Sequence, residues 1–110
     1  MINDDVAGIT ADRIAVRAPK GIPAKMVATY LERCIHAVPT ARTALEAGDF
    51  AQIRVWAHRL KGSGGGYGVP ALTEYAALLE KAAIQGDETG VGDQLGILET
   101  YLRRLDIQPD

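Results

Sequence analysis

One histidine lies among small and cationic residues in the stretch 57–68. His58 is followed by Lys61 three positions later, by Gly62 four positions later and by Gly65 seven positions later. In a helix these spacings place all four residues on one surface patch. The neutral imidazole of a histidine is a nucleophile near neutral pH, because its unperturbed pKa is about 6.5. The pattern therefore predicts an exposed, nucleophilic histidine. If this histidine attacked an acyl phosphate, Lys61 could supply positive charge to the phosphoryl group.

The residues around this histidine favour the approach of a large partner. Gly62 and Gly65 each cost a helix about 1 kcal/mol relative to alanine, and they present no side chain that would block a docking protein. Arg54 lies one turn before the histidine and could add positive charge, while Ala51 and Val55 offer apolar contact area at the rim. No carboxylate is adjacent in sequence to orient the imidazole, so its orientation is expected to come from the fold or from the partner.

The motif resembles the signature of the histidine-containing phosphotransfer (HPt) domain family. The pattern H-x-L-K-G at residues 58–62 is followed by a glycine-rich turn that ends at Gly68. The segment 45–50 ahead of the motif is similar to the family's lead-in to the histidine helix. The resemblance covers roughly residues 22–105 in helix order.

The resemblance implies a phosphorelay function in two-component signal transduction. His58 would be the phospho-acceptor, through Nε2, with Lys61 and Gly62 as supporting positions. The histidine would accept a phosphoryl group from a receiver-domain aspartate and pass it to another receiver aspartate. The expected partners are response-regulator receiver domains and a hybrid sensor kinase. The chain is expected to be a carrier without ATP-dependent kinase activity, to bind no metal or cofactor, and to leave Mg²⁺ to the receiver.

Other interpretations of the same residues are weaker. A Walker loop needs its Lys-Ser/Thr after the glycines, whereas Lys61 precedes them. The pattern Gly66-x-Gly68-x-x-Ala71 imitates a dinucleotide fingerprint but follows a predicted helix instead of a strand. Cys34 and His36 have no further ligand cluster and make a poor zinc site. Two alternatives stay open: a module that binds a receiver or kinase without carrying phosphate, and the dimerisation half of a histidine kinase.

Apolar periodicity predicts an all-α, antiparallel up-down bundle over residues 22–106, with four main helices and a short or kinked leading segment. The first helix is expected to begin near Pro23, and Pro39 to kink or stop it, which places His36 near a helix end. Gly48 is expected to end the next helical stretch, and Asp49 to cap the histidine helix. Trp56 and Tyr67 are expected to pack in the core.

The second half of the chain is expected to form two further helices. One begins near Pro70 and ends at Gly86, and a loop follows at residues 90–92 with Asp93 as a possible N-cap. Leu95, Leu98, Leu102 and Leu105 share one face of the last helix. Residues 1–21 are expected to be an extended lead-in that packs on the bundle, and residues 107–110 a tail.

The composition of the chain excludes several classes of protein. The 110 residues are 47% hydrophobic and 24% charged, which is typical of one globular domain. The formal net charge of −2 lacks the basic excess of a nucleic-acid or membrane-surface binder. The single cysteine, Cys34, excludes an internal disulfide. We expect a cytoplasmic protein, because the sequence shows neither a signal peptide nor an apolar run that could span a membrane. The resemblance to HPt domains implies that it is a monomer.

Overall fold

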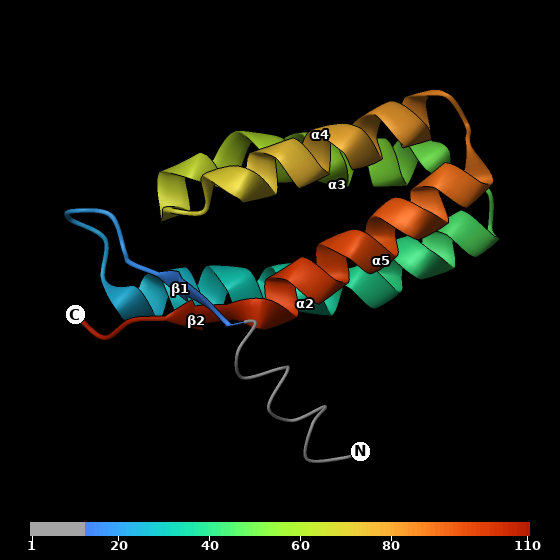
Figure 1. Cartoon of the computed structure of the whole chain (residues 1–110). Helices are drawn as coiled ribbons and strands as arrows, with labels where there is room; N and C mark the ends of the chain where they lie inside the picture. The colour runs from blue at the N-terminus through green and yellow to red at the C-terminus, as the bar shows by residue number, and fades with distance from the viewer. Residues whose placement is uncertain (1–12) are drawn as a thin grey trace, which may run out of the picture.

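The computed structural model describes residues 13–110, and four α-helices make up most of this part of the chain. The elements follow in the order β1 (Ile14–Val16), α2 (Ala24–Glu46), α3 (Phe50–Ser63), a 3₁₀ turn (Gly65–Tyr67), α4 (Pro70–Ile84), α5 (Glu88–Arg104) and β2 (Leu105–Ile107). Short loops join the helices, so successive helices run antiparallel. Helices α3 and α4 form one layer and α2 and α5 the other (Figure 1). The predicted all-α bundle is confirmed.

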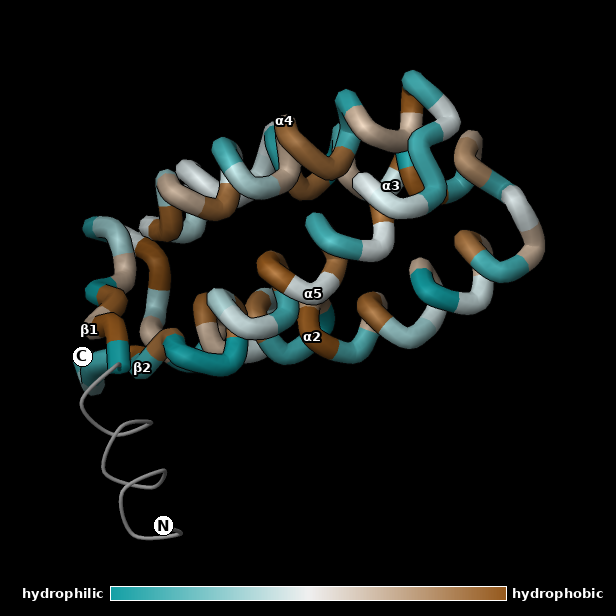
Figure 2. Tube along the Cα trace, turned by 45° about the vertical axis from the view of Figure 1, so that its right-hand side comes forward, coloured by the Kyte–Doolittle hydropathy of each residue, from teal (hydrophilic) through white to brown (hydrophobic). Residues whose placement is uncertain are grey.

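The core lies between these two layers and consists of the inward faces of all four helices. Hydrophobic and hydrophilic residues alternate along the helices (Figure 2), as expected of helices that are buried on one face. The largest fully buried side chains include Ile53 of α3, Leu72 and Leu79 of α4, and Leu95 and Leu98 of α5. The apolar face predicted for the last helix therefore does lie in the core, through Leu95, Leu98 and Leu102.

Local signals determine where the histidine helix starts. Gly48 adopts a left-handed φ of 71°, which glycine accepts without steric cost, and so ends α2. The side chain of Asp49 then accepts a hydrogen bond of 3.1 Å from the backbone N–H of Gln52. Asp49 is therefore the N-cap of α3, as predicted.

The expectation that Pro39 ends a helix or divides it into two stretches is wrong. Helix α2 continues from Ala24 to Glu46 with Pro39 inside it, and His36 lies in its interior instead of near an end. Pro39 is exposed, so the carbonyl that loses its N–H partner can face water. Val38 and Ala41 on either side are buried, and their packing holds the helix together across the proline.

The predicted start of the last helix is also wrong. Helix α5 begins at Glu88, and its N-cap is Asp87, whose side chain accepts a 3.0 Å hydrogen bond from the N–H of Gly90. Residues 90–92 are therefore helical, and Asp93 lies inside the helix. Val91 is fully buried, so extending the helix by a turn buries an apolar side chain that a loop would expose.

A short parallel strand pair closes one end of the bundle and was not predicted. Ile14–Val16 pairs with Leu105–Ile107, which places Leu105 in a strand instead of the last helix. Val16 is 5% exposed, so this part of the lead-in does pack on the bundle as expected. The remainder of the predicted lead-in, residues 1–12, lies outside the described residues.

Candidate functional site

His58 projects from the solvent-facing side of α3, and its side chain is 69% exposed. Its buried neighbours on the helix, Ala57 and Leu60, anchor the opposite side of α3 in the core. The exposed face of residues 50–63 carries Arg54, Arg59 and Lys61 but no acidic residue. The histidine therefore lies on a cationic helix surface in a chain whose formal net charge is −2.

A carboxylate from the neighbouring helix orients the imidazole. Oε2 of Glu80 on α4 lies 2.8 Å from Nδ1 of His58. Because an ionised carboxylate can only accept, the ring must donate from Nδ1 in this contact. In the neutral ring the lone pair is then on Nε2, which makes no hydrogen bond to another residue within 13–110.

The same carboxylate also holds Lys61. Nζ of Lys61 donates to Oε1 of Glu80 over 2.6 Å, so Glu80 bridges the histidine and the lysine. The Lys61 hydrogen bond first, and the His58 hydrogen bond second, hold the pKa of the Glu80 carboxyl below its ordinary value of 4.5. Glu80 is therefore ionised near neutral pH, and its side chain is only 14% exposed.

The packing of α3 against α4 brings Glu80 beneath the histidine. At the base of this helix pair, a β-carbon added to Gly64 would lie 3.0 Å from Cβ of Leu72, so a larger residue would force the two helices slightly apart. The hydroxyl of Thr73 donates to the carbonyl of Lys61 over 2.9 Å and sets the register of the two helices. Glu80 follows Thr73 by two helical turns and therefore lies on the same face of α4.

The glycine-rich turn after α3 is attached to α2 by an aromatic contact. The rings of Tyr30 and Tyr67 stack with centroids 4.0 Å apart, and the hydroxyls of Tyr30 and Ser63 are hydrogen-bonded at 2.5 Å. Burial raises the pKa of Tyr30 to about 12. Tyr67 thus packs as expected, and it helps to hold the turn in place.

The other predicted site residues lie on the same exposed side of the molecule. Ala51, Arg54, Val55 and Gly62 are all exposed on α3, and Gly65 is exposed in the following 3₁₀ turn instead of the helix. A β-carbon added to either glycine would meet no atom within 4 Å. Nothing in the fold therefore fills the space above these two glycines.

Several of the predicted site residues line one hollow beside the histidine. It is lined by Arg54, Val55, His58 and Glu80, and also by Arg59, which was not among the predicted site residues. Glu80 was missed as well, because it lies 22 residues from His58. An acidic residue on the helix after the motif, at a position facing α3, is the signal that could have found it.

Comparison with protein-family models decides the family. The model of the Hpt domain matches residues 25–108. The chain belongs to the Hpt domain family. Searches of curated proteins and of solved structures found no match.

Membership of the Hpt family indicates the general function. Hpt domains carry out histidine phosphotransfer in phosphorelays and interact with receiver domains and kinases. Within residues 13–110 of this Hpt domain, no helix is long and apolar enough to cross a membrane. The same residues contain no group of three or more His, Cys, Asp or Glu side chains that could hold a metal ion. Cys34 is buried in the core, and His36 is exposed on α2.

Proposed function

We propose that this Hpt domain carries the phosphoryl group on Nε2 of His58, between an aspartate of one receiver domain and an aspartate of another. The observation that carries the proposal is the contact of Nδ1 with Glu80, 2.8 Å long. This contact leaves the unshared electron pair of the neutral ring on the exposed Nε2, where a receiver can reach it.

The transfer step follows from this geometry. The lone pair of Nε2 attacks the phosphorus of an aspartyl phosphate, the bond from phosphorus to the aspartate oxygen breaks, and the carboxylate leaves with the electron pair. The ring then holds phosphorus on Nε2 and a proton on Nδ1, and the charge of Glu80 stabilises that protonated ring. The reverse sequence delivers the group to a second aspartate.

Lys61 is placed to support the transferred group. Its ammonium is bound to Glu80 one turn from His58, and its side chain is 36% exposed. A phosphoryl group on His58 adds negative charge next to this ammonium, which can bind it through the donors that Glu80 does not use. Arg54 and Arg59, which both line the hollow, add further positive charge to the same surface.

The remaining parts of the proposal concern the surroundings of the protein. Partners are response-regulator receivers and a hybrid sensor kinase, and Mg²⁺ belongs to the receiver. The four helices of one chain form a complete hydrophobic core, which supports a monomer. We place the protein in the cytoplasm, where receiver domains operate. Light scattering on the purified protein tests the monomer directly.

The decisive test is phosphotransfer from a panel of phosphorylated receiver domains, comparing the wild type with His58→Gln. The side chain is exposed, so the variant should keep its fold, as circular dichroism will show. We expect acid-labile, base-stable label on the wild type and none on the variant. Label on the variant would refute the assignment of His58. Receiver binding with no label on either protein would support a non-catalytic binding module instead.

A further inference from the structure

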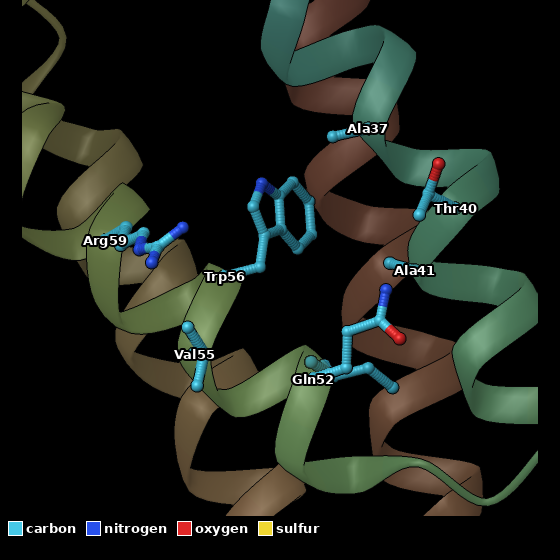
Figure 3. Close-up of a pocket in the computed structure, with 8 residues that line it drawn as sticks. Ala37, Thr40, Ala41, Gln52, Val55, Trp56 and Arg59 are labelled. Atoms are coloured by element: carbon cyan, nitrogen blue, oxygen red, sulfur yellow. The ribbon is translucent and has the colours of Figure 1, made fainter.

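A second hollow lies next to the histidine, in the groove between α2 and α3. Ala37 and Thr40 form the wall on α2, and Val55, Trp56 and Arg59 form the wall on α3. Figure 3 shows the indole of Trp56 projecting from α3 towards α2, between Arg59 on one side and Ala37 on the other. The trough encloses about 280 Å³. This volume is slightly smaller than that of typical small-molecule pockets, but it is large enough to hold one protruding side chain.

The trough is continuous with the site that surrounds the histidine. Val55 and Arg59 line both the trough and the hollow that contains His58 and Glu80. Val55 is 44% exposed, so an apolar side chain faces solvent between the two depressions. A protein that covers both His58 and Val55 therefore lies at the edge of the trough.

The polar groups along this surface have unused hydrogen-bonding capacity. Within residues 13–110, the guanidinium groups of Arg54 and Arg59 form no ion pair, and the indole N–H of Trp56 donates no hydrogen bond. Elsewhere in this part of the chain, Arg42 is paired with Glu99. Two arginines and an indole N–H beside an apolar trough match a partner that offers an apolar side chain next to carboxylates.

We propose that the receiver domain that exchanges phosphoryl groups with His58 inserts an apolar side chain into this trough, beside Trp56, and places carboxylates against Arg54 and Arg59. The inference rests on the proposed function and adds to it the contact that selects the partner. Aromatic and arginine side chains around a small pocket are the usual composition of an energetically dominant contact. The trough then discriminates among receivers, while His58 and Glu80 serve the chemistry common to all of them.

The first test fills the trough without touching the histidine. Thr40→Trp adds a large side chain at an exposed position of the α2 wall, and Thr100→Trp adds the same side chain at an exposed position of α5, outside the proposed contact. The donor is the receiver domain of the panel that labels the wild type most rapidly. We expect Thr40→Trp to lower kcat/KM for transfer about tenfold or more through a raised KM, and Thr100→Trp to change it less than about twofold.

A small phosphoryl donor separates docking from chemistry. Phosphoramidate reaches His58 without a protein partner, so its rate of labelling should be the same for the wild type and Thr40→Trp. As a second variant, Arg59→Glu should slow transfer from the receiver and reduce the salt dependence of the rate.

The outcomes distinguish this inference from the proposed function. Wild-type transfer kinetics in both Thr40→Trp and Arg59→Glu would overturn the docking trough, and so would an equal loss in Thr100→Trp. Failure of phosphoramidate and of every receiver to label the wild type would instead overturn the proposed function. Loss of receiver transfer with intact phosphoramidate labelling supports the trough.

Discussion

Gly62 offers a direct test of the claim that the surface beside His58 is kept open for a partner. Gly62 lies in α3, and a β-carbon added to it would meet no atom within 4 Å. Gly62→Ala therefore changes only the helix propensity, which should stabilise the fold by about 0.5–1 kcal/mol. For a domain of this size the melting temperature should rise by about 2–8 °C.

Gly64 is the matched control, two residues further along the chain. Its added β-carbon would lie 3.0 Å from Cβ of Leu72 and 3.2 Å from the carbonyl oxygen of Val69, both in the tightly packed base of the α3–α4 pair. Gly64→Ala should therefore destabilise the protein by about 1–3 kcal/mol. Thermal and denaturant unfolding of the two variants, followed by circular dichroism, measures both effects.

A larger side chain at Gly62 connects this difference in stability to function. Gly62→Leu should keep its helix content but block receiver docking, since the leucine extends over the space next to His58. Transfer from a receiver should fall while labelling by phosphoramidate persists. Destabilisation by Gly62→Ala, or normal receiver transfer by Gly62→Leu, would refute the reasoning that this glycine serves docking instead of packing.

Three further predictions concern other parts of the fold. Burial raises the pKa of the Cys34 thiol to about 11. A thiol reagent at pH 8 should therefore modify the native protein far more slowly than the unfolded protein. Equal rates of modification would contradict the burial of Cys34 in α2. Hydrogen bonds from Arg103, and then from Arg42, hold the pKa of the Glu99 carboxyl below its ordinary value of 4.5. The contribution of Glu99 to stability is therefore present above pH 4.5 and is lost as the pH falls through the lowered pKa. In urea titrations at a series of pH values, Glu99→Gln should reduce this loss of stability at acid pH, and an unchanged pH dependence would exclude the effect. Gly68 has a φ of 85°, and a β-carbon added to it would lie 2.9 Å from the carbonyl oxygen of Arg17. Gly68→Ala should therefore lower the free energy of unfolding by about 1–3 kcal/mol. Wild-type stability in this variant would contradict the close approach.

The histidine surface could be predicted from the sequence because its signals are local. His58, Lys61 and Gly62 lie within one helical turn or so of each other, and Asp49 sets the start of their helix. Helical geometry alone therefore places them together on one exposed face. What it could not supply was the group that orients the imidazole.

Glu80 was missed because its position depends on tertiary packing. The register of α4 against α3 depends on the close approach at Gly64 and on the hydrogen bond from Thr73 to Lys61. Neither contact has a periodic signature in the sequence. A shift of α4 by one residue would rotate Glu80 away from the histidine by about 100°.

The errors in element boundaries have the same origin. Asp87 and Asp93 are equally good N-caps by residue type, and the burial of Val91 decides between them in favour of the longer helix. Pro39 carries a strong local signal to break a helix, yet its neighbours pack in the core and α2 continues. The strand pair joins Ile14–Val16 to Leu105–Ile107, and local propensity says nothing about so distant a pairing.

The most direct test of the central claim is ¹⁵N and ³¹P NMR of the protein before and after labelling with phosphoramidate. We expect the neutral ring of His58 to carry its proton on Nδ1, and phosphorus to become bonded to Nε2 of His58. In Glu80→Gln, where the charge that holds the proton is absent, the preference for the Nδ1 proton should weaken. Phosphorus on Nδ1, on His36, or on no histidine at all would exclude Nε2 of His58 as the phosphoryl carrier.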